Sequence, residues 1–421
     1  MGWLAYREET LYCKIKQIPA SHNLTYRDGK IETEKYWDIM FSEKKDSDLI
    51  ENISQFRSIF LDSIKIHMRS DVPVGTSLSG GIDSSSIASA ICSIFPNLLI
   101  KTFSIYYTSR DGMDERPFIN EVISKYSNIQ PFMYEPTDRA ILDIFYEYMA
   151  HQDFPLSGSS FLSQYFVMKL ARENGIKVLL DGQGADEYLV GYLRSFYRMV
   201  GQNILSKRGY RIFKTHINRE NYDLKTSLKR WIGCLISSVS TEQVMNILEY
   251  RYSQSFLPKS KGAPFKLENI GNSRLDDFLY HLIFYTELPG LLYHGDLNSM
   301  NFSIESRVPF LDHRLVEFMF SIPDYHKVKD GVSKYILREA MKDKLPDNIY
   351  LRVDKKGFLT PGEARWLRGP LIGYIDNIRS SRLDFLDKKK IKIIINDYIK
   401  GSSKNEKIVW RLAMFSEWMN N

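Results

Sequence analysis

Apolar residues recur at three- and four-residue steps in the segment that begins at Leu49, a spacing typical of one face of an α-helix. The positions concerned are Leu49, Ile53, Phe56, Phe60 and Ile64. The step Asp71-Val72-Pro73 ends this helix, because proline disfavours helical backbone in the residue before it. The pattern therefore predicts a helix that packs one apolar face against a core.

After this helix, segments with strand patterns alternate with segments with helical patterns. The expected strands are Val74 to Leu78, Ile100 to Ile105 and Lys177 to Asp181, and the expected helices are Ser84 to Ile94, 114–126, 138–149 and 161–173. Strands that alternate with helices indicate a parallel sheet covered on both faces. The expected fold class is therefore α/β, a doubly wound parallel sheet, with a mostly helical half from Tyr192 onward.

The first 40 residues follow a different pattern. Glu9 to Ile15 is rich in β-forming residues, and Tyr26 to Lys30 contains the Asp-Gly pair that favours a hairpin turn. The polar run Ser42 to Asp48 then predicts a linker. We therefore expect a short β segment over residues 1–40 and one large domain over residues 45–421.

Composition and charge restrict the class of protein more than its function. Hydrophobic residues make up 43% of the 421 residues and charged residues 26%, which excludes a disordered or fibrous chain. The formal net charge of +6 does not separate nucleic acid from small anions, and the run Lys388-Lys389-Lys390 is typical of a solvated helix face. Cys13, Cys92 and Cys234 form no closely spaced pair, which favours a reducing cytoplasm. The apolar stretch 278–293 is interrupted by polar residues and proline, so we expect no membrane span. From the mild charge and the solvated lysine run we expect no nucleic-acid binding.

The stretch Ser79-Gly80-Gly81-Ile82-Asp83-Ser84-Ser85 carries the clearest chemical signal. It follows a predicted strand and opens a predicted helix, where parallel α/β sheets bind ligands. Gly80 and Gly81 let the backbone approach a bulky anion, which the helix N-terminus and the hydroxyls of Ser79, Ser84 and Ser85 would face. The lysine of the common nucleotide P-loop is missing. The alternative is a plain Ser-Gly-Gly turn in which Asp83 and Ser84 cap a helix.

This stretch resembles the PP-loop, SGGxDSS, of the ATP pyrophosphatases, and three further blocks resemble the synthetase domain of the asparagine synthetase family. The blocks are LDGQGADE…GY over residues 180–192, NSM…ESRVPFLD over residues 298–312, and GVSK…LREA…LP…RVDKKGF over residues 331–358. They are similar to the family patterns SGEGxDE…GGY, NSM…ExRxPFLD and K…LRxA…LP…RxxKxGF. The resemblance covers residues 45–420 and implies an adenine nucleotide α-hydrolase-like fold.

The resemblance implies that ATP is cleaved between its α and β phosphates, with Mg²⁺ across the anions. Asp83 and Asp186 each follow a predicted strand closely enough to hold the ion together, and the family assigns Mg–pyrophosphate to both positions. From the residues alone, a helix cap at Asp83 and a helix-dipole partner at Asp186 remain open. The family's adenosine pocket implies backbone contacts from Leu78, Ser104 and Gly182.

Basic residues of the last block are candidates for charge stabilisation. Lys355 resembles the lysine of the RxxKxGF pattern, and a fixed cation there would stabilise the tetrahedral oxyanion of amide formation. Its neighbour Lys356 is interpreted as a solvated charge. Lys334 and Arg338 are four residues apart, so on one helix they would share a face and grip pyrophosphate together. The alternative for this pair is an exposed basic face.

Further polar residues of the blocks receive supporting roles. We expect Glu305, Arg307 and Asp312 to form a buried ion network that shapes the site. Asp296 and Ser299 are candidates for lining the acceptor pocket. None of these five residues is assigned a chemical step.

The chain departs from the family pattern at Gln183. Asparagine synthetases have a glutamate here, which is held to take a proton from the attacking ammonia. Glutamine cannot act as a base, although it can orient a nucleophile through hydrogen bonds. Amide formation therefore remains the expected reaction, with Gln183 as a positioning group, while asparagine as the product is open.

A second departure lies at the N-terminus. Glutamine-dependent members carry a cysteine nucleophile directly after the initiator methionine, and this chain has Gly2 there. Residues 1–37 resemble only the last strands of the glutaminase domain, and Cys13 is far from any N-terminal amine. Three explanations are open: a separate glutaminase subunit, the use of free ammonia or an amine, or a truncated gene product.

The expected function is an ATP-dependent, AMP-forming amide ligase. A carboxylate is adenylated and ammonia or an amine then displaces AMP, with conversion of aspartate to asparagine as the default. A macrolactam or peptide-amide cyclase, as in lasso-peptide cyclases and β-lactam synthetases, resembles this fold and uses no glutamine. A degenerate ATP-binding subunit is the non-enzyme alternative. A tRNA-thiolating PP-loop enzyme would leave the ESRVPFLD block unexplained.

Overall fold

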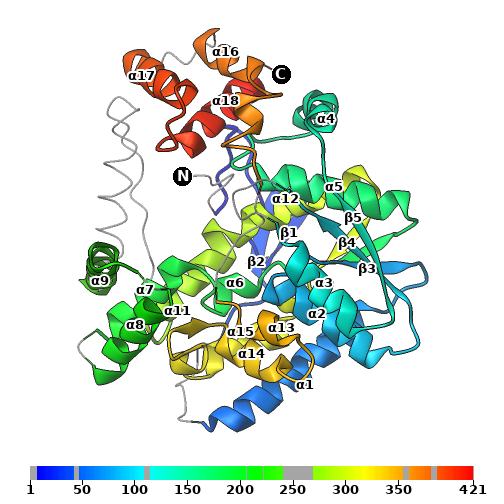
Figure 1. The fold of residues 1–421 in the computed structure, drawn as a ribbon, viewed down its shortest axis with the longest axis vertical. Helices are drawn as coiled ribbons and strands as arrows, with labels where there is room; N and C mark the ends of the chain where they lie inside the picture. Colours follow the sequence, from blue (N-terminus) through cyan, green and yellow to red (C-terminus); the bar gives the residue numbers. More distant parts are fainter. Residues whose placement is uncertain are drawn as a thin grey trace.

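A computed structural model describes residues 7–41, 47–108, 114–204, 206–220, 222–239, 269–353, 360–380 and 386–420. Its centre is a five-stranded sheet with the order β5-β4-β3-β6-β7, in which every neighbouring pair is parallel (Figure 1). The strands are β3 (Val74–Ser77), β4 (Ile100–Ile105), β5 (Ile129–Tyr134), β6 (Val178–Leu180) and β7 (Glu305–Arg307). The predicted doubly wound α/β fold is confirmed.

The strand order reverses between β3 and β6. From β3 the chain proceeds outward to β4 and β5, and it then returns to the other side of β3 to add β6 and β7. Thr76 of β3 pairs with Thr102 of β4 and with Leu180 of β6, so the three strands end at the same edge of the sheet. Loops that leave a parallel sheet in opposite directions open a crevice at such a point.

Helices cover both faces of the sheet. α5 (Ser160–Glu173) and α12 (Leu288–Asn301) pack on one face. α2 (Ile82–Ile94) and α3 (Arg116–Lys125) pack on the other, with α1 (Leu49–His67) against the outer side of α2 (Figure 1).

Alternate residues of one strand serve two separate hydrophobic cores. Val178 and Leu180 of β6 belong to the core on the α1–α2 side, and Leu179 between them belongs to the core on the α5 side. This follows from the two-residue period of a strand. The second core also includes residues of α4 (Asp138–Ala150), α16 (Gly373–Ser380), α17 (Lys388–Ile399) and α18 (Glu406–Asn420).

α1 confirms the helix predicted from residue 49. The Asp48 side chain accepts a hydrogen bond from the backbone N–H of Ile50, and Phe56, Phe60 and Ile64 are fully buried. The helix ends at His67, before the Asp71-Val72-Pro73 step. Its buried face contacts α2, α13 (His313–Ser321) and α14 (Tyr335–Met341), which ties the sheet to the later part of the chain.

The mostly helical half expected after Tyr192 is also confirmed. The short helix α6 (Ala185–Tyr188) lies just before this half. The further helices of the half are α7 (Leu193–Gln202), α8 (Lys207–Arg219), α9 (Leu224–Val239), α11 (Arg274–His281), α13 (His313–Ser321), α14 (Tyr335–Met341) and α15 (Asp347–Leu351). A π-helical turn covers Leu282–Thr286, 3₁₀ turns cover Pro309–Leu311, Asp324–His326 and Trp366–Arg368, and β8 (Val328–Lys329) pairs with β9 (Val332–Ser333). Within the described ranges, the helices are all too short or too polar to cross a membrane.

Two strands of the central sheet, β5 and β7, have no counterpart in the sequence prediction. Both lie at edges of the sheet. β5 contains Pro131, which cannot donate a ladder hydrogen bond and is tolerated at an edge. β7 is the polar tripeptide Glu305-Ser306-Arg307, without the apolar run of a buried strand.

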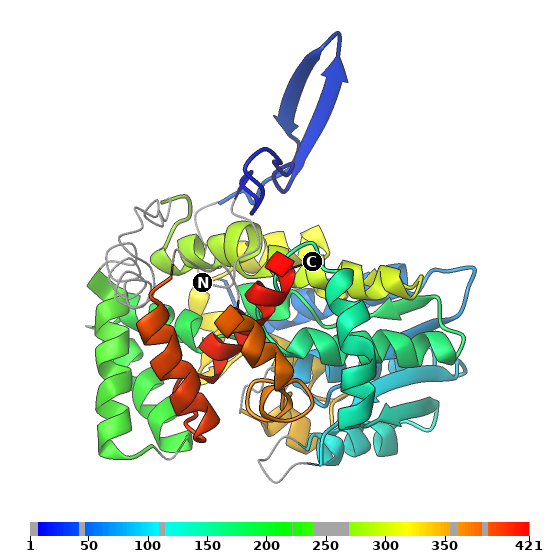
Figure 2. The ribbon, with the colours of Figure 1, turned by 90° about the horizontal axis from the view of Figure 1, so that it is seen from above.

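The N-terminal region forms the predicted hairpin, but the preceding strand prediction is wrong. β1 (His22–Arg27) and β2 (Lys30–Lys35) pair around Asp28 and Gly29, which have φ of 52° and 78° and suit a tight hairpin turn. Figure 2 shows this hairpin extending away from the rest of the chain. Glu9 to Ile15 forms turns with an isolated bridge from Glu9 to Lys16. The Thr10 hydroxyl donates to the carbonyl of Ile15, a local side-chain bond that competes with strand pairing.

Candidate active site

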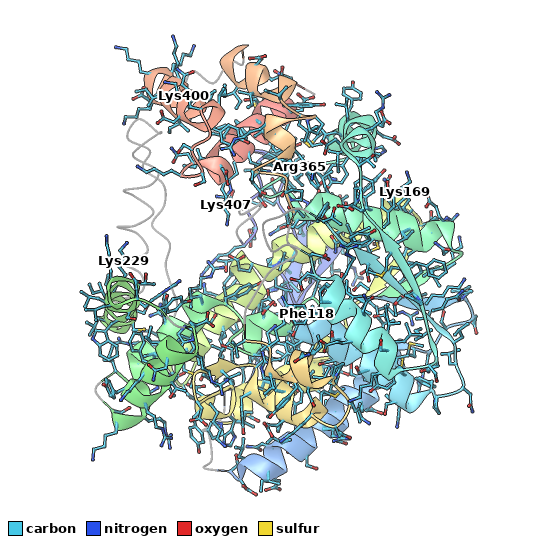
Figure 3. All side chains as sticks on the ribbon, in the orientation of Figure 1. Phe118, Lys169, Lys229, Arg365, Lys400 and Lys407 are labelled. Carbon is cyan, nitrogen blue, oxygen red and sulfur yellow. The ribbon has the colours of Figure 1, made fainter. Side chains whose placement is uncertain are left out.

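The glycine–serine loop joins β3 to α2 at the edge where the strand order reverses. Gly80 has φ of +75°, and a Cβ there would lie 2.9 Å from Phe118 Cβ and 3.2 Å from the backbone nitrogen of Ile119. Phe118, labelled in Figure 3, belongs to α3. The loop therefore requires glycine at position 80 both for its backbone conformation and for its contact with α3.

Serine hydroxyls hold this loop in shape. Ser84 Oγ lies 3.1 Å from the backbone nitrogen of Ser79, which donates to it, and 3.0 Å from Ser79 Oγ. Ser84 and Ser85 are buried, at 6% and 0% exposure, whereas Ser79 is partly exposed. Ser84 thus acts on the loop itself, and Ser79 is the hydroxyl of the three that is best placed for a ligand.

Asp83 does not cap α2. The N-cap residue is Gly81, which makes no side-chain capping bond, and the Asp83 carboxylate instead points to Lys334. Lys334 Nζ lies 2.5 Å from Asp83 Oδ2 and 2.6 Å from Asp186 Oδ1. The structure therefore brings together three of the predicted site residues from three separate parts of the chain.

This three-residue group is almost completely buried. The Lys334 side chain is 5% exposed, and those of Asp83 and Asp186 are 16% and 15% exposed. Burial alone would lower the pKa of Lys334, but the two carboxylates outweigh it and the pKa of the ammonium is raised. Lys334 is therefore charged at neutral pH and compensates two carboxylates.

Gly191 is required by the close approach of this group. A Cβ at Gly191 would overlap Asp186 Oδ1 and lie 2.6 Å from Lys334 Cε. The backbone nitrogen of Gly191 donates to the carbonyl of Asp186, and that of Lys334 donates to the carbonyl of Leu189. The loop after α6 is thus fixed against both charged residues.

Lys334 and Arg338 do not share the helix face that their spacing predicts. Lys334 precedes α14 and has left-handed backbone with φ of 57°. Arg338 lies within α14 and donates to the carbonyls of Ser333 and Tyr350. The expectation of one joint basic grip is therefore corrected: Lys334 meets the carboxylates, and Arg338 fastens the backbone on both sides of α14.

The predicted adenosine-pocket residues lie at the ends of neighbouring strands. Ser104 Oγ donates to the carbonyl of Leu78 at 2.5 Å, which links β4 to β3. A Cβ at Gly182 would lie 3.2 Å from Asp83 Cβ, so the loop after β6 runs directly beside the start of α2. Leu78, Ser104 and Gly182 are thus assembled at one edge of the sheet.

Lys355, with its neighbour Lys356, lies outside the described residues. Arg352, just before them, donates to the carbonyl of Gly80 at 3.2 Å and to Glu115 Oε1 at 2.9 Å, and its guanidinium lies over the Phe118 ring. No local pattern marks Arg352 for this role, because its partner Glu115 is 237 positions away in the sequence. This contact fastens residue 352 to the glycine–serine loop.

The expected network of Glu305, Arg307 and Asp312 is wrong. Arg307 pairs with Glu305 at 2.7 Å, but the Glu305 side chain is 58% exposed, and Arg307 also donates to the carbonyls of His67 and Arg69 at the end of α1. Asp312 pairs with Arg314 and caps α13. Neighbouring charges on a strand and on the following turn point to different partners, so their proximity in sequence did not make one network.

The remaining candidates lie on two elements, the loop after β6 and α12. Gln183 is partly exposed in the loop after β6. The Ser299 hydroxyl donates to the carbonyl of Asp296 within α12 and is fully buried. Sequence analysis gave no role to Asp181, whose carboxylate meets Ser77 and Gln164 at the end of β6.

The donor set suits a hard cation. Asp83 Oδ1 is buried and has no hydrogen-bond partner among the described residues. Carboxylate oxygens are the ligands that Mg²⁺ prefers, usually one or two of them together with water and phosphate oxygens. No group of three or more metal-binding side chains occurs in the part of the chain that the structure describes, so Asp83 and Asp186 would hold such an ion together with its anionic ligand.

The fold and this arrangement define a PP-loop α/β protein whose polar groups converge at the switch point of a parallel sheet. A family model described as asparagine synthase matches residues 55–420, and the chain belongs to the asparagine synthase family. Asparagine synthetase [glutamine-hydrolyzing] 1 of Bacillus subtilis is 28% identical over 97% of this chain and 66% of its own length. Amidase chyE of Penicillium rubens is 25% identical over 86% of this chain and 61% of its own length. The chain thus spans slightly less than two thirds of the length of these curated relatives.

Proposed function

We propose that this protein is an AMP-forming amide ligase that activates a carboxylate with Mg–ATP and transfers the acyl group to an amine or ammonia. The observation that carries the proposal is the pair of carboxylates, Asp83 and Asp186, joined by the buried Lys334 beside the glycine–serine loop. Removing charged groups from water costs free energy, so charges that are buried in this way usually have a partner or a function. A site for two adjacent phosphates and their cation accounts for both signs of charge.

In the first step a substrate carboxylate oxygen attacks the α-phosphorus of ATP, and the bond from that phosphorus to the bridging oxygen breaks. Pyrophosphate leaves with the electron pair. The backbone N–H groups of Gly80 and Gly81 and the N-terminus of α2 would bind the phosphate oxygens. Lys334 would neutralise the charge that develops on the leaving pyrophosphate. Asp83 and Asp186 would hold Mg²⁺, which would supply Lewis-acid stabilisation of the phosphate charge.

In the second step the amine attacks the acyl carbon, and the bond from that carbon to the AMP oxygen breaks. Lys355 is the candidate cation for the tetrahedral oxyanion. Arg352, which precedes it by three residues, donates to the carbonyl of Gly80 in the glycine–serine loop.

The test is release of AMP and pyrophosphate over a panel of carboxylates, with ammonia, glutamine and amines supplied in turn. Wild-type protein should catalyse carboxylate-dependent pyrophosphate–ATP exchange, and Asp83→Ala should lower it by about 10²-fold or more. Asp343→Ala is the matched control, because that carboxylate is 57% exposed and pairs with Arg57 on the surface. Wild-type exchange in Asp83→Ala would overturn the site assignment.

A peptide-amide or macrolactam cyclase is the second candidate, and Gln183 supports it, because a glutamine replaces the glutamate that serves ammonia. A cyclase should release AMP with a peptide that carries both carboxylate and amine, and not with aspartate plus ammonia. The same panel also separates the nitrogen sources, since a requirement for an added glutaminase would indicate a separate subunit. Failure of the protein to bind Mg–ATP in calorimetry would favour a degenerate subunit instead.

A further inference from the structure

A polar network surrounds the carboxylate of Asp181 at the end of β6. Ser77 Oγ, from the end of β3, donates to Asp181 Oδ1 at 3.4 Å, and Gln164 Nε2, from α5, donates to Oδ2 at 3.3 Å. The backbone nitrogen of Asp181 donates to the carbonyl of Arg307 at 2.8 Å. Two elements thus hold this carboxylate at the switch point and a third holds its backbone, at the start of the loop that carries Gln183.

The far side of the network fixes which atoms of Gln164 face Asp181. Asn298 Nδ2, from α12, donates to Gln164 Oε1 at 3.1 Å and to the carbonyl of Phe161 at 2.9 Å. Asn298 and Gln164 are buried, at 1% and 8% exposure. Because the carbonyl oxygen of Gln164 accepts from Asn298, its amide NH₂ group points to Asp181, which is therefore held as a hydrogen-bond acceptor.

The hydrogen-bond donors that contact the Asp181 carboxylate are polar but uncharged. Its hydrogen-bond donors are Ser77, Gln164 and the backbone N–H groups of its own loop. The titratable group on the adjacent element is Asp83 of α2, next to Gly182, whereas the Arg307 side chain on β7 is directed to α1. Burial raises the pKa of Asp181 above its usual value, and the hydrogen bonds offset this only in part. A carboxylate of this kind is a stronger base than an exposed one.

We propose that Asp181 is the general base that takes the proton from the attacking amine, the task for which Gln183 has no basic group. Asp181 and Gln183 lie two positions apart in one loop, so a carboxylate is present two residues before the glutamine. This inference rests on the proposed function, because it concerns the second step of that reaction.

The step balances in protons and electrons. The amine nitrogen forms a bond to the acyl carbon, and the bond from that carbon to the phosphate oxygen of AMP breaks, so that AMP leaves with the electron pair. One N–H proton passes to the Asp181 carboxylate and then to solvent. Gln183, beside it, orients the amine by accepting a hydrogen bond from another N–H group.

The experiment separates the two half-reactions in the Asp181→Asn variant. Its carboxylate-dependent pyrophosphate–ATP exchange should stay within about threefold of wild type, while amide formation should fall by about 10²- to 10⁴-fold. The acidic limb of the pH profile for amide formation should also disappear, because a base works only when deprotonated. Asp343→Asn provides the same chemical change on the surface and should alter neither reaction.

Rescue supplies the sharper test. Adding Gln183→Glu to Asp181→Asn returns a carboxylate to the loop and should restore amide formation at least tenfold, which a purely structural role for Asp181 would not explain. Amide formation at the wild-type rate and pH dependence in Asp181→Asn would overturn the inference while leaving the proposed function intact. Absence of exchange in wild-type protein would instead overturn the proposed function. If Asp181→Asn fails to fold, Asp181→Ser is measured in the same way, with exchange reporting that the site is formed.

Discussion

Lys334 Nζ lies between Asp83 Oδ2 and Asp186 Oδ1, at 2.5 Å and 2.6 Å. One buried ammonium thus contacts two buried carboxylates and offsets one of their two negative charges, so the group carries a net negative charge that a divalent cation would reverse. In the proposed function, the same three side chains would form the phosphate site when Mg²⁺ and its anion bind.

Lys334→Met should destabilise the protein by about 3–5 kcal/mol, because it leaves two like charges buried without their cation. Mg²⁺ should restore part of this loss, since it supplies the missing positive charge. Urea unfolding with and without Mg²⁺ measures both effects. Lys389→Met, on the exposed face of α17, is the control and should change stability by less than about 0.5 kcal/mol. Equal unfolding free energies for Lys334→Met and wild type would contradict this account of the charge balance.

Gly191→Ala should damage the site, because the new methyl group would overlap Asp186 Oδ1. We expect a loss of about 2–3 kcal/mol in unfolding free energy, together with weaker binding of Mg–ATP. Gly290→Ala is the matched control: it adds the same methyl group to α12, where nothing lies within 4 Å of the added Cβ. This control should be neutral or slightly stabilising. Thermal unfolding and calorimetric titration of the two variants decide the point, and similar behaviour of both would remove the argument from close approach.

Much of the sheet was predictable because its inner strands have strong local patterns. The runs that form β3, β4 and β6 are short and apolar or β-branched, and the Asp28–Gly29 turn has its own signal. β5 and β7 escaped prediction because an edge strand tolerates Pro131 and the polar residues Glu305 and Arg307. The hydrophobic pattern of a strand reflects how deeply that strand is buried. Edge strands are the least buried strands of a sheet, so their pattern is the weakest.

The site was predictable only where the sequence motif names its residues. The motifs indicated Asp83, Asp186 and Lys334, but their mutual contact depends on folding across 251 positions between Asp83 and Lys334. The Arg352–Glu115 pair and the network around Asp181 have no local signature, because each partner lies on a distant element. The network predicted for Glu305, Arg307 and Asp312 fails for the opposite reason, because charges that are close in sequence point to partners on different elements.

Arg352→Ala should weaken ATP use rather than abolish it. The side chain holds the carbonyl of Gly80 and the carboxylate of Glu115, so its loss frees the glycine–serine loop from the segment before Lys355. We expect the KM for ATP in pyrophosphate exchange to rise about tenfold, from the loss of one charged hydrogen-bond group worth about 1.5–3 kcal/mol. Arg352→Lys keeps the charge without the two-pronged geometry and should lie between Ala and wild type. An unchanged KM in Arg352→Ala would show that the loop holds its shape without this contact.

Stability should fall in mild acid because of His294, which is 1% exposed and packs its ring on Phe161. Burial lowers the pKa of His294 from 6.5 to about 4 in the folded protein. Between these values the unfolded chain binds a proton that the folded chain does not, so the free energy of unfolding decreases as the pH falls from 6.5 to about 4. The loss is about 3 kcal/mol at the lower end. Urea unfolding over this range should therefore have a shallower pH dependence in His294→Gln than in wild type. His313→Gln, whose parent side chain is 67% exposed, should retain the wild-type slope. If His294→Gln loses stability with acid as steeply as wild type, another buried group must take up the proton.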